Sequence, residues 1–260
     1  KLSLISLPSF SMPSLMIFFV FFALYSRVTL LRMMVQSNFG YHATLAGMVL
    51  SPSGLVVICI MPIIGKLVNK VQAKYLISTG MFLMAFGMWA TAQITPQSDY
   101  WTLVQVRILQ VIGLPFLFVP SSTLAFSKIK AVDSSNASAI VALMRNLGGS
   151  IGIAIVTNKL IQSQQVEQNN IVQHLTNFDI GYNNALYNMT NTIKNLGFSE
   201  TQASQMALGK IYRELMHQAS LLAYADAYEF VATIMILLGI VALFMPKNEL
   251  HGKKKTVVIE

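Results

Sequence analysis

The sequence predicts an all-α membrane protein with six transmembrane helices. Of its 260 residues, 54% are hydrophobic and only 11% are charged, whereas soluble domains are about 25% charged. The apolar residues are gathered into six runs, each near the roughly 20 residues that a helix needs to cross the hydrocarbon core. Lysines also mark alternate connections between these runs. The runs cover residues 14–36, 43–68, 75–94, 100–127, 134–161 and 219–245.

The positions of the lysines predict how the chain is oriented. Residues 38–42 and 95–99, which form the first and third connections, contain no Lys or Arg. Short loops rich in Lys and Arg stay in the cytoplasm, so both ends of the chain are predicted to be cytoplasmic. The lysines that support this orientation precede the first run, flank the second and fourth connections and fill the tail. They are Lys1, Lys66, Lys70, Lys74, Lys128, Lys130, Lys247, Lys253, Lys254 and Lys255.

Each run is expected to form a helix, because β-barrel strands would show segments of about ten residues with alternating polarity. The second run is expected to be interrupted at Ser51-Pro52-Ser53-Gly54 and again at Pro62, and the fourth carries Pro115 and Pro120. Membrane helices tolerate such breaks where the freed carbonyls find partners or line a cavity. A packing kink and a cavity-lining role both remain open for these prolines.

One large polar segment divides the chain. Residues 162–218 are rich in Asn and Gln and are expected to form a long periplasmic or extracellular loop, with amphipathic helical stretches at 182–196 and 199–217. The chain starts with Lys and shows no signal peptide, so it is expected to be part of a longer or processed polypeptide. The remaining parts are a cytoplasmic lead-in at 1–13, the first five spans within 14–161, the sixth span at 219–246 and a basic cytoplasmic tail at 247–260.

Composition argues against several classes of function. The net charge of +8 could indicate nucleic acid binding, but cytoplasmic loops account for much of the excess, and no nucleic acid partner is expected. Cys59 is the single cysteine, so neither a disulfide nor a cysteine metal cluster can form within the chain. The four histidines are scattered without metal-ligand spacing, and no Ser/His/Asp set is evident. We therefore expect no metal site and no enzyme activity.

Arginines within the spans are the most informative polar residues. A charge at mid-membrane costs roughly 3 kcal/mol on insertion scales and usually faces the protein interior or water. Arg145 is predicted to lie deepest, roughly 16 Å into the fifth span, and to have a functional or inter-helix role. Arg27, Arg32 and Arg107 are placed toward the outer half, where snorkelling to the surface is favoured for Arg32 and remains open for Arg27.

Acidic residues are absent from the first five spans. Asp226 and Glu229 lie one turn apart in the sixth, where an outer ion-pair network with Arg32 and Arg107 and a solvated helix end are alternatives. Any proton-titrating carboxylate is therefore expected outside this part of the chain. The fifth span also holds Gly148, Gly149 and Gly152, whose spacing favours close helix packing. A mixed apolar transport cavity is predicted from Arg145, Asn146, Gln110, Arg107, Gln36, Tyr25 and Met144.

Several stretches together resemble the C-terminal half of the fourteen-span drug:proton antiporters of the major facilitator superfamily, the EmrB/QacA type. The most specific stretch is Arg145-Asn146-Leu147-Gly148-Gly149-Ser150-Ile151-Gly152. The cytoplasmic loop motif of the superfamily matches at Gly65, Leu67, Lys70 and Lys74, whereas Asn69 replaces its acidic residue. Further matching stretches occur in the family's order at 40–47, 51–54, 61–67, 107–113, 118–120 and 218–228.

The resemblance implies the C-terminal six-helix bundle of a proton-driven multidrug exporter that works by alternating access. It implies hydrophobic or amphiphilic small-molecule substrates, no cofactor beyond the proton gradient, and a place in the bacterial inner membrane. It also implies an N-terminal half that carries the proton-binding acids, and in Gram-negative members a periplasmic adaptor and an outer-membrane channel. An exporter of one dedicated substrate, such as a siderophore or metabolite, and a non-transporting membrane scaffold are the alternatives.

Overall fold

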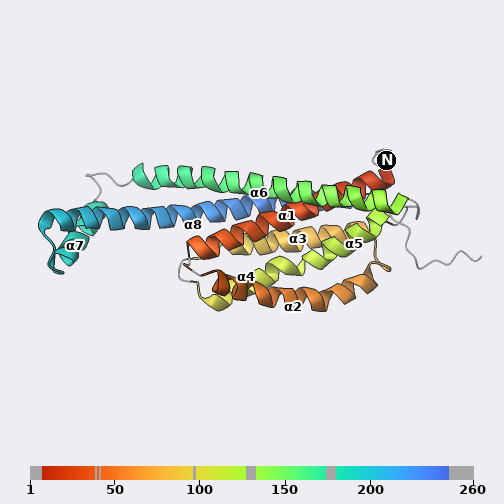
Figure 1. Cartoon of the computed structure of the whole chain (residues 1–260), viewed down its shortest axis with the longest axis horizontal. Coiled ribbons are helices and arrows are strands. Elements are labelled where there is room, and N and C mark those ends of the chain that lie inside the picture. Colours follow the sequence, from red (N-terminus) through yellow and green to blue (C-terminus); the bar gives the residue numbers. More distant parts are fainter. Residues whose placement is uncertain are drawn as a thin grey trace, which may run out of the picture. The chain divides into compact units, whose positions relative to one another are not determined.

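The structure, a computed structural model, describes residues 8–38, 40, 42–95, 98–126, 133–173 and 180–245, and most of these form α-helices (Figure 1). No strand occurs among them. The helices are α1 (Pro8–Ser37), α2 (Ala43–Leu67), α3 (Ala73–Ala92), α4 (Tyr100–Ile112), α5 (Leu114–Phe126), α6 (Ser134–Gln173), α7 (Ile180–Lys194) and α8 (Glu200–Leu243).

Helix length and hydropathy confirm the all-α membrane fold. Within the described residues, five helical stretches are long and apolar enough to cross a membrane, and Ser51–Leu67 adds a shorter apolar stretch within α2. Together they fall on the six apolar runs that the sequence shows. The five are Phe10–Ser37, Ala73–Ala92, Tyr100–Ala125, Ser134–Gln173 and Glu200–Leu243.

The expected interruption of the second span is wrong, because α2 continues through Pro52 and Pro62. Proline at position 52 removes the N–H that would bind the carbonyl of Met48. That carbonyl instead accepts hydrogen bonds from the Ser51 hydroxyl at 3.3 Å and from the Tyr100 hydroxyl at 3.1 Å. A break does occur in the fourth span, at Gly113 between α4 and α5, where Pro115 follows.

The chain divides into two compact units, Lys1–Thr157 with Tyr228–Glu260, and Asn158–Ala227. In the first unit, α3 packs against α4 and α5, α1 packs against α5, and α2 packs against α4. The C-terminal part of α8 joins this bundle through α3, where the Ser78 hydroxyl donates to the Gly239 carbonyl at 2.8 Å. The bundle therefore contains the C-terminal part of α8 as well as the helices α1 to α5.

Glycines on α6 allow it to lie directly on the backbone of α1. A Cβ added at Gly148 would collide with the carbonyl of Phe18, and one at Gly152 would lie 2.6 Å from the carbonyl oxygen of Phe22. At Gly149, the added atom would lie 2.8 Å from the ring of Tyr25. Small residues let membrane helices approach this closely, so these three positions set the distance between α1 and α6.

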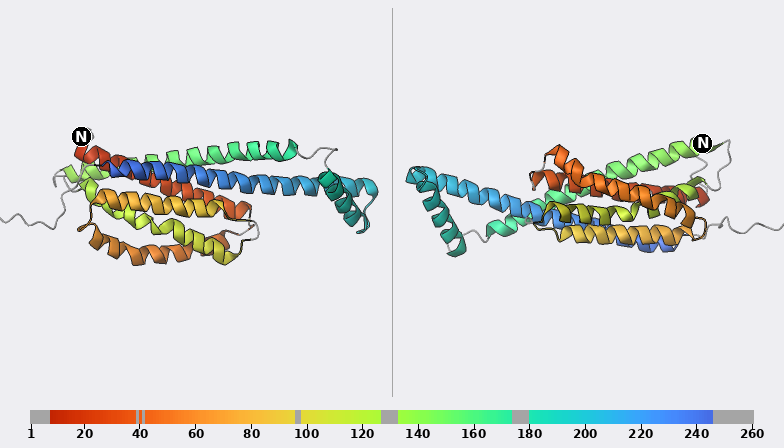
Figure 2. Two further views of the ribbon diagram at one scale, coloured as in Figure 1. Left: turned by 180° about the vertical axis from the view of Figure 1, so that it is seen from behind. Right: turned by 90° about the horizontal axis from the view of Figure 1, so that it is seen from below.

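The second unit shows that the polar segment is largely helical. Rather than ending near residue 161, α6 continues to Gln173, and α8 begins at Glu200 rather than near 219 (Figure 2). Beyond the apolar residues, Gln side chains of α6 contact polar side chains of α8. Gln164 donates to the Ser220 hydroxyl at 3.3 Å, and Gln168 donates to the Tyr212 hydroxyl at 3.4 Å. The side of the membrane on which this segment lies stays a prediction.

Within the second unit, α7 packs on the first turns of α8 through a small apolar cluster. Ile193 of α7 and Ala203 and Ala207 of α8 are fully or nearly buried, and Leu186 and Met189 pack against them. Lys194 forms an exposed ion pair with Glu200 at 3.1 Å beside this cluster. The expected helix at 182–196 corresponds to α7, whereas the stretch expected at 199–217 is the first part of α8.

We expect Gly148→Ala to destabilise the protein by about 1–3 kcal/mol, because the added methyl group overpacks the contact between α6 and α1. Unfolding of the purified full-length protein in mixed micelles measures this. Gly209→Ala on α8 is the matched control, since a Cβ there meets nothing within 4 Å. Equal stability of the two variants would contradict the close contact between the helices.

The cap at the start of α4 is expected to depend on pH. The Asp99 carboxylate accepts hydrogen bonds from the Thr102 hydroxyl at 2.6 Å and the Thr102 N–H at 3.1 Å, and the hydroxyl is the larger cause of a lowered Asp99 pKa. Because the pKa is lowered on folding, this cap stabilises the fold above the ordinary carboxyl pKa and is lost as the pH falls through the folded value. Thr102→Val should therefore raise the Asp99 pKa, measured by NMR titration of the labelled carboxyl carbon. An unchanged titration would contradict the hydroxyl's role.

Candidate functional site

Two arginines of the first unit are buried in one hydrogen-bonded cluster, which we call the arginine–glutamine cluster (Arg27, Thr91, Arg107 and Gln110). Arg27 of α1 donates to the backbone carbonyl of Gln110 at 3.0 Å, and Arg107 of α4 donates to the Gln110 side-chain carbonyl at 3.3 Å. The Gln110 amide nitrogen donates to the Thr91 hydroxyl at 2.6 Å. Thr91 in turn donates to the carbonyl of Gly87 at 2.7 Å.

Burial makes this cluster a structural centre of the bundle. Gln110 is 0% exposed, Arg27 is 2% exposed and Arg107 is 7% exposed. Among the described residues no Asp or Glu pairs with either arginine, so neutral oxygens of one glutamine hold both guanidinium groups. Snorkelling of Arg27, which the sequence left open, is wrong because its side chain does not reach the surface. The cluster joins α1, α3 and α4 by polar contacts inside an apolar bundle.

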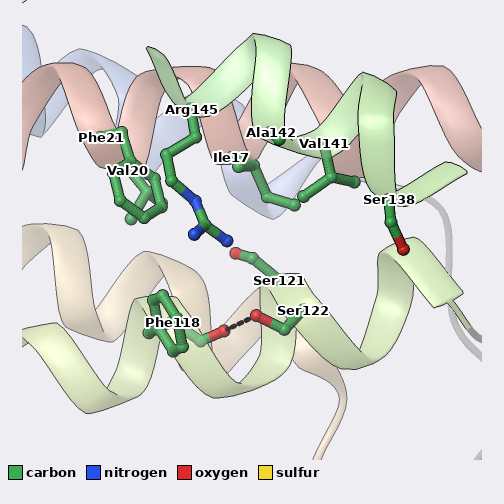
Figure 3. Close-up of a pocket in the computed structure, with 10 residues that line it drawn as sticks. All are labelled: Ile17, Val20, Phe21, Phe118, Ser121, Ser122, Ser138, Val141, Ala142 and Arg145. Atoms are coloured by element: carbon green, nitrogen blue, oxygen red, sulfur yellow. Dashed lines mark hydrogen bonds between the residues drawn. The ribbon is translucent and has the colours of Figure 1, made fainter. Parts of the chain in front are cut away.

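A second polar site surrounds Arg145. A cavity of about 270 Å³ lies between α1, α5 and α6 (Figure 3). The Arg145 guanidinium lies over the ring of Phe21, with 4.8 Å between its central carbon and the ring centroid, a distance typical of cation–π contact. We call this cavity the Arg145 pocket. It is lined by Ile17, Val20, Phe21, Phe118, Ser121, Ser122, Ser138, Val141, Ala142 and Arg145.

Two polar groups of the Arg145 pocket have no hydrogen-bond partner. They are the Nε of Arg145 and the hydroxyl of Ser121, and both atoms are buried. Ser121 is only 2% exposed, whereas the neighbouring Ser122 hydroxyl donates to the carbonyl of Phe118 at 2.7 Å. Unpaired buried polar groups are uncommon in folded proteins. The pocket therefore combines apolar walls with unused hydrogen-bonding capacity.

The structure separates the residues that the sequence grouped into one cavity. Arg107 and Gln110 meet in the arginine–glutamine cluster, whereas Arg145 lies in its own pocket. Met144 lines a different, mostly apolar pocket of about 230 Å³ with Phe10 and Ile140. Of the other predicted residues, Tyr25 packs its ring against Gly149 and Phe21, while Asn146 and Gln36 are exposed on α6 and α1.

The predicted outer ion pairs involve Arg32, Asp226 and Glu229. Arg32 is exposed on α1 and makes no ion pair with Glu229 in the described part of the chain. Glu229 instead lines an aromatic groove of about 400 Å³ on α3 and α8, beside Phe86 and Trp89. Asp226 belongs to the second unit. An ion-pair network of these residues stays a prediction.

The loop motif forms the tight connection from α2 to α3. Gly65 and Leu67 lie in the last turn of α2, and the Asn69 side chain donates to the Gly65 carbonyl at 3.5 Å. Lys70 is exposed in the turn, and the Lys74 ammonium lies 5.1 Å from the ring centroid of Tyr75. Asn69 thus contacts the end of its own helix where the family motif has an acid.

Thr91, Phe21 and Ser121 are the site residues that the sequence did not single out, and Arg27 was noted there without its partner. The signal for Arg27 was present, since an arginine within an apolar span needs a polar partner. Thr91 and Ser121 carried no such signal, because lone hydroxyl groups are common in membrane helices. Phe21 was one of fifteen phenylalanines, and only the fold places it beneath Arg145.

Gln110→Leu should destabilise the bundle by about 1–3 kcal/mol or more, because it leaves the buried Arg107 without its side-chain acceptor. Unfolding of the purified protein in mixed micelles measures the change. Gln105→Leu, an exposed position on the same helix, serves as the control and should be near neutral. If both variants unfold alike, the cluster does not stabilise the fold as described.

Comparison with known proteins agrees with this architecture. The Major Facilitator Superfamily profile matches residues 2–153. Similar proteins include the colistin resistance protein EmrB of Acinetobacter baumannii, 26% identical over 95% of this chain and 48% of the relative. The multidrug export protein EmrB of Escherichia coli K12 is 24% identical over 94% of the chain and 47% of the relative. The fatty acid resistance protein FarB of Neisseria gonorrhoeae is 21% identical over 86% and 43%, respectively.

The chain spans about half the length of the curated relatives that it matches. Its described helices include membrane-spanning stretches in the region that the family profile covers. The resemblance to EmrB-type export proteins that the sequence indicates is thereby confirmed. The chain is a multi-pass membrane protein that belongs to the Major Facilitator Superfamily.

Proposed function

We propose that the chain acts as the C-terminal half of a proton-coupled exporter of hydrophobic or amphiphilic compounds. The Arg145 pocket forms part of the substrate path in this proposal. The observation that carries it is a cavity of about 270 Å³ whose lining holds two buried polar atoms without a hydrogen-bond partner, the Nε of Arg145 and the hydroxyl oxygen of Ser121. Ligand pockets typically combine apolar walls with a few polar groups that orient the ligand.

The relatives support an export role. Two similar proteins are named for multidrug export or colistin resistance, and a third for fatty acid resistance. Multidrug export requires a site that accepts varied apolar shapes. The Arg145 pocket offers such walls through Phe21, Phe118 and Val141. In this proposal the protein lies in a bacterial inner membrane with both ends in the cytoplasm, the orientation that the lysine-bearing loops predict.

Proton coupling in this proposal depends on residues outside the bundle. The first five spans contain no Asp or Glu, and Glu229 lies in an aromatic groove away from the Arg145 pocket. A partner half would supply the titrating carboxylates and the second wall of the substrate path. Large apolar side chains on α2 are open for contact with such a half or with lipid, among them Leu55 at 68% and Ile58 at 67% exposed.

Further partners belong to the proposal as well. In this view, the segment 162–218 contacts a periplasmic adaptor, which in turn joins an outer-membrane channel. The apolar cluster of α7 and α8 gives that segment a defined helical shape. The bundle itself needs no cofactor in this mechanism, since the proton gradient supplies the energy.

Arg145→Ala in the full-length protein should lower efflux of hydrophobic compounds by about tenfold, because the pocket loses its charged hydrogen-bond donor. Efflux of a fluorescent hydrophobic dye from cells measures this, with membrane abundance checked by immunoblot. Arg32→Ala is the matched control, since Arg32 is exposed and lies outside the pocket. Unchanged efflux by Arg145→Ala would remove the role of Arg145, and no efflux by the wild type would favour a scaffold.

A further inference from the structure

We propose that the Arg145 pocket binds the carboxylate head group of an amphiphilic organic anion, with Arg145 and Ser121 as its hydrogen-bond donors. This inference names the substrate class for the site described above and so rests on the proposed export function. It follows from the charge of the pocket, from its hydrogen-bond donors that have no partner, and from the apolar side chains that form the remaining walls.

The charge of the pocket is positive and uncompensated. None of the 10 residues that line it is acidic, and Arg145 is the only charged one. A guanidinium at membrane depth needs a compensating charge or strong acceptors. Arg27 and Arg107 obtain acceptors from Gln110, but Arg145 has no comparable partner. A ligand with a negative head group would supply the missing acceptor.

The unused donors face the same space from two helices. Figure 3 shows the guanidinium of Arg145, on α6, and the hydroxyl of Ser121, on α5, pointing toward one another across the pocket. Arginine carries five N–H donors in a planar fork that matches a carboxylate. Stacking on Phe21 covers one face of the guanidinium and leaves its donor edge free. Two donors on facing walls can therefore hold the two oxygens of one carboxylate.

The remaining walls suit an apolar tail. Ile17, Val20 and Val141 line the pocket next to Phe21 and Phe118. The volume of about 270 Å³ is near the lower end for a small-molecule site, so it accommodates a head group and the first part of a tail. A quaternary ammonium head would face the guanidinium charge without an acidic residue to attract it. The pocket thus discriminates against organic cations.

Binding to the purified full-length protein in lipid nanodiscs tests this inference. Three pyrene-labelled probes are compared, which differ only in their head group: a carboxylate, an alcohol or a trimethylammonium. Pyrene fluorescence measures the affinity of the protein for each probe. The wild type should bind the carboxylate probe at least about tenfold more tightly than the trimethylammonium probe, because hydrogen bonds between charged groups are the strongest available. The alcohol probe should fall between them.

Substitutions identify the side chains that cause the preference for the carboxylate probe. Arg145→Gln should abolish it, and Ser121→Ala should weaken the carboxylate probe by about threefold or more while leaving the alcohol probe unchanged. Arg32→Gln and Thr123→Ala are matched controls, since both positions are exposed outside the pocket, and both should keep the wild-type preference. If Arg145→Gln fails to fold, Arg145→Lys with Ser121→Ala decides, since the lysine keeps the charge but loses the planar fork.

Transport of the same probes separates this inference from the proposed function. Selective binding of the carboxylate without transport of any probe would support the anion site and overturn the exporter. Transport of all three probes without preference would support the exporter and overturn the anion site. Absence of binding, or a preference that survives Arg145→Gln, would also overturn the anion site.

Discussion

The contact between α6 and α1 determines where Arg145 lies in this bundle. Helices within a bilayer gain little from the hydrophobic effect, and close van der Waals packing holds them together instead. Gly148 and Gly152 allow α6 to lie on the carbonyls of Phe18 and Phe22. Arg145, one turn before Gly149, is thereby held above Phe21. A larger residue at Gly148 would separate the helices and open the pocket that Arg145 lines.

Three arginines of this bundle, of which Arg27 and Arg107 are buried and Arg145 is partly exposed, are held in two different ways. Arg27 and Arg107 donate to the carbonyl oxygens of Gln110, so that no acidic residue is needed. Gln110 also donates to Thr91, and the cluster therefore joins α1, α3 and α4. Arg145 rests against an aromatic face and keeps a buried donor without a partner. All three arginines leave a buried Nε without a hydrogen-bond partner, but Arg27 and Arg107 each donate a terminal N–H to Gln110, whereas Arg145 makes no such bond among the described residues. This contrast assigns the first site to stability and the second to ligand binding.

Much of the fold could be predicted from the sequence. Run length and hydropathy identified the membrane spans, since both reflect the thickness of the bilayer directly. The spacing of Gly148 and Gly152 predicted close packing, although the partner helix could not be named, because helix neighbours depend on tertiary contacts. Pro52 was expected to break α2, but the hydroxyl of Tyr100, distant in the sequence, satisfies the freed carbonyl of Met48. The extension of α6 into the polar segment was missed because hydropathy marks spans rather than helix ends.

The candidate site was harder to predict for the same reason. Arg145 stood out because a charge within an apolar run is costly, but its neighbours Phe21 and Ser121 come from other helices. A double-mutant cycle of Arg145→Gln and Ser121→Ala, measured as affinity for a carboxylate probe, tests most directly whether the two side chains hold one head group. Strong coupling is predicted, with Ser121→Ala having little further effect once Arg145 is replaced. Additive losses in the double variant would contradict a shared site.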